Sequence, residues 1–170
     1  MATPTYDLLD STTLSASATS VTFSSLDTIA SGYRDLVLVA DVLAASGSTN
    51  VSTEVRLNND SGSNYAYVFM RSNASSAAAP DTTRMFLGSG AKPTSTDRGL
   101  FTLEIFDFSQ TDKHKSAIAK GLAPADEFYY WAHRWANTNA ITSLEIFANT
   151  SDGSQEFAST STFYLYGIAG

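Results

Sequence analysis

VSTEVRL, residues 51–57, alternates between side chains suited to a protein interior and side chains suited to water. The interior set is Val51, Thr53, Val55 and Leu57, and the water-facing set is Ser52, Glu54 and Arg56. A period of two residues is that of a β-strand with one buried face. The stretch RDLVLVADVL (34–43) is apolar in both phases, which predicts a central strand covered on both faces.

The same alternation recurs along the chain, and helical periodicity is nearly absent. About ten short runs of this kind are separated by clusters of Gly, Asn, Asp, Ser and Pro. This spacing predicts an antiparallel β-sandwich, jelly-roll-like, with little helix. We expect residues 1–20 to be an N-terminal arm on a neighbouring subunit and residues 21–170 to be one domain. The expected core is Leu36, Leu38, Val55, Phe101, Leu103, Ile105, Ile146, Leu165 and Ile168.

Two segments fit more than one structure. NASSAAAPDTT (73–83) is rich in Ala and Ser, and we expect a loose loop or one helical turn stopped by Pro80. PADEFYYWAHRW (124–135) has acidic residues that suit a helix start, yet its FYYW run has high β-propensity. The turn-like ANTN that follows favours a strand over a helix here.

The composition excludes several classes of chemistry and partner. The chain has 170 residues, no cysteine and a net charge of −7. Disulfides and thiol chemistry are therefore excluded, and nucleic acid is not an expected partner. The longest apolar run, LVLVA (36–40), is too short to span a membrane, and the first residues do not resemble a signal peptide.

The loop RLNNDSGSNY (56–65) is rich in oxygen-bearing side chains. Its candidate ligand contacts are Asn58, Asn59 and Asp60. The spacing does not match a helix–loop–helix calcium site, because Leu57 would occupy the first ligand position. Asn, Asp and Gly also favour tight turns, so we interpret the loop as a hairpin connection and expect no metal.

No stretch carries a catalytic signature, and we expect no catalytic residue and no cofactor. GSGAK (88–92) lacks the spacing of a phosphate-binding loop and is interpreted as a turn. Glu104 and Asp107 are three residues apart and would face opposite sides of a strand, so they cannot act as a pair. We expect His114 on a solvated turn or at a strand start, and His133 either packed among aromatic rings or exposed.

The candidate interface or ligand surface is a cluster of aromatic residues with one arginine. It consists of Tyr129, Tyr130, Trp131, Arg134 and Trp135. Trp, Tyr and Arg dominate the binding energy of protein interfaces, and flat rings also stack on sugars. The alternative is that these rings fill the interior of the sandwich or cover its end.

Four stretches in order resemble a group of small virion structural proteins of tailed, often marine, bacteriophages. They are SGYRDLVLV (31–39), RLNNDSGSNY (56–65), WANTNAITSLEIF (135–147) and STFYLYGI (161–168). The resemblance covers nearly the whole chain and implies a β-sandwich virion protein. It carries over no catalytic or metal-binding residue.

These observations lead to one expected function and one alternative. We expect a capsid decoration or stabilising protein in the virion, with the major capsid protein as its partner. We also expect self-association, as a homotrimer, because an open sandwich leaves edge strands and this chain has few lysines to block them. The alternative is a tail-associated tip module that binds a host receptor or surface glycan. Neither role requires a membrane or a cofactor.

Overall fold

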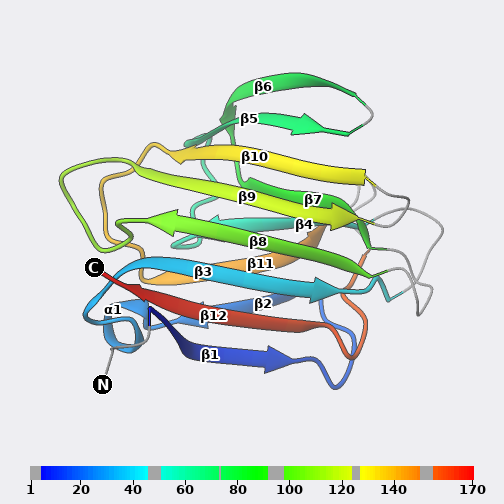
Figure 1. Ribbon diagram of the computed structural model, residues 1–170, viewed down its shortest axis with the longest axis horizontal. Coiled ribbons are helices and arrows are strands. Elements are labelled where there is room, and N and C mark those ends of the chain that lie inside the picture. Colours follow the sequence, from blue (N-terminus) through cyan, green and yellow to red (C-terminus); the bar gives the residue numbers. More distant parts are fainter. Residues whose placement is uncertain (1–4, 46–50, 73, 92–97, 124–126, 150–154) are drawn as a thin grey trace.

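The computed structural model describes residues 5–45, 51–72, 74–91, 98–123, 127–149 and 155–170. In this part of the chain two antiparallel sheets pack face to face, which confirms the predicted all-β sandwich (Figure 1). The elements are β1 Tyr6–Thr13, β2 Ser20–Ser24, α1 Leu26–Ile29, β3 Tyr33–Val42, β4 Val51–Leu57, β5 Tyr65–Arg71, β6 Ala74–Thr82, β7 Met85–Ala91, β8 Gly99–Phe106, β9 Lys115–Ala123, β10 Glu127–Trp135, β11 Ser143–Asn149 and β12 Thr162–Ala169.

The two sheets differ in width. The larger has the order β1-β12-β3-β8-β9-β10-β5-β6, and the smaller has the order β2-β11-β4-β7. Three pairs of consecutive strands are adjacent in the larger sheet, β5 with β6, β8 with β9 and β9 with β10, and β10 also pairs with β5. The larger sheet therefore extends past β7, the edge strand of the smaller sheet.

The core lies between the sheets, where the alternating pattern placed it. Eight of the nine residues expected in the core are at most 1% exposed, and the ninth, Ile168, is half-buried. The inward phase of β12 runs through Phe163, Leu165 and Gly167, so Ile168 belongs to the outer face, where it pairs with Tyr6. Gly167 occupies an inward position but has no apolar side chain, so its apolar neighbour Ile168 was expected to face inward instead.

Phe101 occupies a space that three glycines leave open. A Cβ atom on Gly88, Gly99 or Gly121 would come within 2.3, 2.6 or 2.2 Å of the Phe101 ring. Such contacts are shorter than any Cβ tolerates, so the glycines are required for β7, β8 and β9 to surround this ring.

Three expectations about the local structure are corrected. Residues 74–82 form the edge strand β6 rather than a loop or helical turn, and Pro80 lies beside a break in the pairing with β5, where its missing N–H is tolerated. Residues 88–91, expected as a turn, belong to β7. Part of the expected arm is β1, which pairs with β12 in the same chain. Asn73, Lys92 and residues 124–126 lie outside the described residues.

Residues 127–135, whose sequence fitted both helix and strand, form the strand β10, as the turn-like ANTN after them predicted. The central strand β3 differs from expectation on one side. Its inner face is covered by the smaller sheet, but in the described part of the chain no layer covers its outer face (Figure 1). Val37 is nevertheless only 7% exposed, lying between Glu104 and Tyr166 of the adjacent strands.

Candidate functional site

The polar loop does not form a hairpin, because it leaves β4 in the smaller sheet and enters β5 in the larger one. Asn58 and Asn59 both have positive φ, at 52° and 55°. Asn adopts this left-handed conformation more readily than most residues. The loop is therefore a tight crossing between the sheets.

The side chain of Asn58 fastens this crossing to the chain ahead of β11. Its Oδ1 accepts hydrogen bonds from the backbone N–H of Thr142 at 2.8 Å and of Ser143 at 3.2 Å. Its Nδ2 donates to the carbonyl of Ala140 at 2.8 Å. Both ends of the amide are thus engaged in holding the fold.

Asp60 also holds the loop, because both of its carboxylate oxygens accept hydrogen bonds. Its Oδ1 accepts from the N–H of Gly62 at 2.8 Å, and its Oδ2 accepts from Asn64 Nδ2 at 2.9 Å and from Trp135 Nε1 at 2.7 Å. Burial acts to raise the pKa of Asp60, but these three hydrogen bonds together outweigh it and leave the pKa below its ordinary value. Of the three candidate loop contacts, Asn59 is exposed, whereas Asn58 and Asp60 are half-buried.

The aromatic group does not form a single surface. The period of two along β10 points Tyr129, Trp131 and Trp135 into the interior, where they are 4%, 6% and 0% exposed. Tyr130 and Arg134 point to the opposite, outer face, half-buried and exposed respectively. The alternative of rings that fill the interior therefore describes three of the five residues.

Trp131 is the centre of an aromatic cluster on the part of the larger sheet that extends past the smaller one. It stacks on Phe69 and Phe86, with ring centroids 4.4 and 5.4 Å apart, and meets the edge of Tyr67 at 5.1 Å. Phe86 comes from the edge strand β7, so the rings join the two sheets where their widths differ. The inward-facing rings of β10 are thus used within the chain.

His133 belongs to this cluster and is 4% exposed. Burial lowers its pKa to about 4, although the hydrogen bond to the carbonyl of Phe86 acts in the opposite direction. The ring is therefore neutral near pH 7, with Nε2–H donating to Phe86 O at 2.8 Å. Nδ1 has no hydrogen-bond partner among the described residues. The histidine is packed among rings, as one of the two expectations stated.

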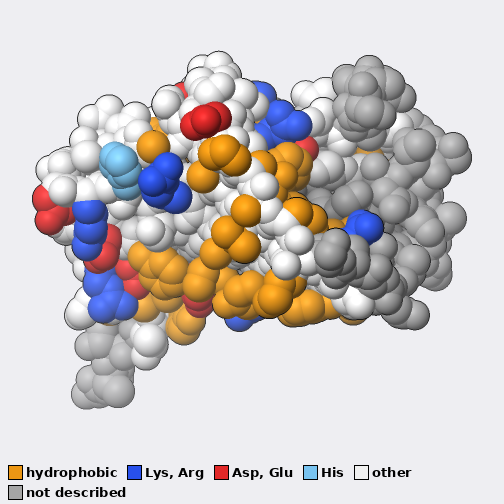
Figure 2. All heavy atoms as spheres, turned by 90° about the horizontal axis from the view of Figure 1, so that it is seen from above, with side chains coloured by type: hydrophobic (Ala, Val, Ile, Leu, Met, Phe, Trp, Pro, Cys, Tyr) orange, Lys and Arg blue, Asp and Glu red, His pale blue; other side chains and the backbone are white. Residues whose placement is uncertain are grey.

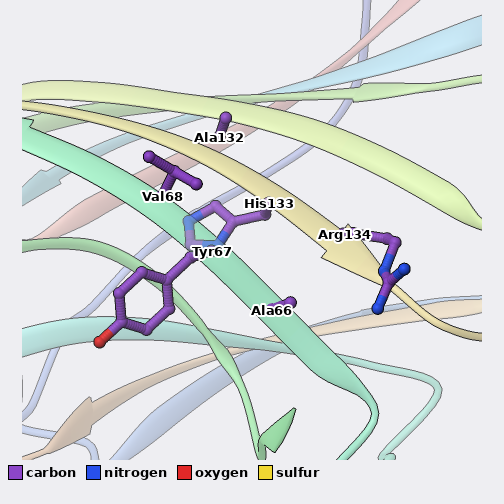
Figure 3. A pocket seen from close by; sticks show the side chains of 6 residues that line it. All are labelled: Ala66, Tyr67, Val68, Ala132, His133 and Arg134. Carbon is purple, nitrogen blue, oxygen red and sulfur yellow. The ribbon is translucent and has the colours of Figure 1, made fainter. Parts of the chain in front are cut away.

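A shallow open depression lies between β5 and β10 (Figure 3). It is lined by Ala66, Tyr67, Val68, Ala132, His133 and Arg134. The small side chains of Ala66 and Ala132 leave room for the depression, and Arg134 is the one charged residue that lines it. This arrangement can contact a flat apolar or anionic group, but its lining contains no carboxylate that could act as an acid or base.

The remaining candidates are separate from this depression. Glu104 is half-buried on the outer face, and Asp107 lies beyond the end of β8, where its carboxylate pairs with Lys113 at 2.7 Å. His114 is exposed. Within the described ranges no three His, Cys, Asp or Glu side chains gather as a metal site, and no helix is long and apolar enough to cross a membrane.

Three charged residues that sequence reasoning did not place in the interior are buried. Asp35 is 3% exposed, and Glu54, which was expected to face water, is 1% exposed and pairs with Arg84. The third, Lys115, is 0% exposed. Its ammonium group donates to the carbonyls of Gln110, Lys113 and Thr138, at 2.5, 3.2 and 3.1 Å. Burial lowers its pKa from the ordinary value. Its place in the inward phase of KSAIAKG was the available signal. Lys115 holds together the loops at one end of β9.

The four stretches behind the resemblance meet in two pairs. Residues 56–65 contact residues 135–147 through Asn58, Asp60 and Trp135, as described above. Residues 31–39 pair with residues 161–168 as β3 with β12, where the ring of Tyr33 covers Gly167 so closely that a Cβ there would lie 2.5 Å from it. No family model and no curated protein matches the chain.

Proposed function

We propose that this chain is a structural protein of a bacteriophage virion that decorates or stabilises the capsid. One observation carries the proposal: in the four stretches behind the resemblance, polar and aromatic residues such as Asn58, Asp60 and Tyr33 hold the fold together. Asn58 and Asp60 join the two sheets, and Tyr33 covers Gly167. Residues that are used in this way suit a protein whose function is its shape and its surfaces.

We infer further that the sandwich is wound as a jelly roll. When β5, β6, β9 and β10 are set aside, the sheets have the orders β1-β12-β3-β8 and β2-β11-β4-β7. Every connection between these eight strands then passes from one sheet to the other, except that from β4 to β7, which stays in the smaller sheet. This is the winding of two Greek keys. Such double sheets occur in viral capsid proteins, which supports placing the chain in a virion with the major capsid protein as partner.

The proposal is tested by counting copies. Particles purified from cells that express the chain are quantified by mass spectrometry against the major capsid protein. A decoration protein is present at a copy number comparable to that of the capsid protein, and a reconstruction of the particle shows the sandwich repeated on the head. Absence of the chain from purified particles would falsify the virion assignment.

The alternative is a tail-associated tip that binds a receptor or glycan. The depression between β5 and β10 favours it, because Tyr130 and Arg134 lie on the same outer face. A tip protein is present in only a few copies per particle and lies at the end of the tail. The same counting experiment therefore separates the two roles.

A further inference from the structure

The outer face of the larger sheet carries most of the apolar surface that this molecule exposes. Among the described residues, eight large hydrophobic side chains are at least 36% exposed, and seven of them lie on this face. Five belong to neighbouring strands β8, β9, β10 and β5, and two belong to β1. The seven are Tyr6, Leu8, Val68, Met70, Leu100, Leu122 and Phe128.

Leu100, Leu122 and Phe128 are direct neighbours in one row of the strand register. Leu8, Val68 and Met70 lie at the ends of two further rows that cross the sheet. One row crosses the sheet as Leu8, Tyr166, Val37, Glu104, Ile118, Ala132 and Val68. The next row is Ser11, Tyr164, Val39, Thr102, Lys120, Tyr130 and Met70. Hydrophobic side chains gather along the corresponding lower side of the molecule in Figure 2. A connected apolar face of this extent is unusual on a monomer and marks an interaction surface.

We infer that this outer face binds the same face of a second copy of the chain. The first reason is area. Eight strands about 4.8 Å apart and about 25 Å long present a face on the order of 800 Å², about what each partner buries in a stable complex. Sheets packed face to face are also the arrangement that already forms the core of this sandwich.

The second reason is the placement of charge. Glu104 and Lys120 are the charged residues in the two central rows. They occupy adjacent strands, β8 and β9, and the point midway between them lies near the centre of the face. A two-fold axis in the plane of the interface through that point exchanges the two positions. Glu104 of each copy then meets Lys120 of the other, so that the charges are paired when the face is buried.

The self-complementary pattern selects a dimer. In a cyclic trimer each copy contributes two different surfaces, whereas a single face that pairs with itself gives two-fold symmetry. The charged residues of the central rows sum to zero, although the whole chain carries −7. The two central rows therefore add no net charge to a contact between two copies. This association is independent of the virion proposal, since it requires no particle.

The experiment is sedimentation equilibrium of the purified full chain from roughly 1 to 100 μM. We expect a dimer, and we expect Leu122→Glu to weaken it by at least about 30-fold. The matched control is Ile29→Glu, because Ile29 is also exposed at 36% but lies on α1, away from the face. Both sites are exposed, so neither variant is expected to unfold the chain, and circular dichroism verifies this.

A charge-reversal cycle tests the two-fold geometry. Glu104→Lys and Lys120→Glu each place like charges together and weaken the dimer, while the double variant restores it. A wild-type monomer over this range, a trimer, or a dimer that survives Leu122→Glu overturns the inference. If a wild-type monomer binds capsids through this face, the occupant is a capsid protein and self-association is rejected while the virion proposal stands.

Discussion

The indole Nε1 of Trp135 donates a hydrogen bond of 2.7 Å to Oδ2 of Asp60, and this contact ties β10 to the loop between the two sheets. Trp135 is fully buried, and its ring stacks on Tyr65 with centroids 6.3 Å apart. Tyr65 in turn begins the strand that follows the loop. The loop therefore has a fixed shape because a buried ring and a carboxylate hold it from the side.

We expect Trp135→Phe to lower the free energy of unfolding by about 1.5–3 kcal/mol, the usual contribution of a hydrogen bond to a charged group. A double-mutant cycle with Asp60→Ala, followed by urea denaturation, measures the coupling. Trp131→Phe is the matched control, since the Trp131 indole N–H has no hydrogen-bond partner among the described residues. Equal losses for the two tryptophans would show that ring size, and not the bond to Asp60, determines the stability.

The alternation along the strands predicted most of the faces correctly, with Glu54 and Ile168 as exceptions, but it could not assign strands to sheets. The Asn and Asp residues of the loop indicated a tight connection, which the positive φ of Asn58 and Asn59 confirms. The same local chemistry serves a hairpin or a crossing between sheets. What decides is the contact of Asn58 with Thr142, which is 84 residues away in sequence. A local sequence pattern does not indicate which distant residue its side chains will contact.

The errors at β6 and β7 have a similar cause. Ala and Ser have low β-propensity, yet residues 74–82 become a strand because β5 offers an edge to pair with. The glycines of β7 indicated a turn, whereas Gly88 is needed to admit the ring of Phe101. On β10 the residue types suggested a binding surface, but the period of two divides them between the interior and the outer face. Tertiary contacts override propensity in each case.

Gly88→Ala tests the space around Phe101. The added Cβ would lie 2.3 Å from the ring, so we expect a loss of about 1–3 kcal/mol in the free energy of unfolding. Phe101→Leu in the same chain should recover part of the loss, because all three nearest atoms belong to that ring. Gly121→Ala is the comparison, since its Cβ also meets the carbonyl oxygen of Leu100 at 2.7 Å and Phe101→Leu cannot relieve that contact. Equal rescue of both variants would contradict this account.

Leu103→Ala and Ile105→Ala test the inward face of β8. Both side chains are at most 1% exposed, and each truncation should cost about 2–5 kcal/mol because a cavity remains. Ile29→Ala removes a similar side chain from an exposed position outside the sheets and should cost much less. Thermal and urea unfolding measure all three. A change below about 0.5 kcal/mol at both β8 positions would be surface behaviour and would reject the assigned face.

His133 makes stability depend on pH in a direction that the structure determines. Its pKa is about 4 in the folded protein and about 6.5 in an unfolded chain. The unfolded state therefore binds the proton more tightly, and the contribution is fully present above pH 6.5 and is lost as pH falls towards 4. The loss is about 3 kcal/mol at most. His133→Gln removes the titration while keeping an amide that can donate to the carbonyl of Phe86.

The measurement is the free energy of unfolding between pH 7 and pH 4 for the wild type and for His133→Gln. Glu54 acts in the opposite sense, because burial raises its pKa and favours the folded state at low pH. Its effect is common to both proteins, so the difference between their pH profiles isolates His133. The matched control is His114→Gln, at an exposed position, which should retain the wild-type profile. If His133→Gln also retains it, the histidine does not lie buried and neutral against Phe86, and the aromatic cluster is packed differently.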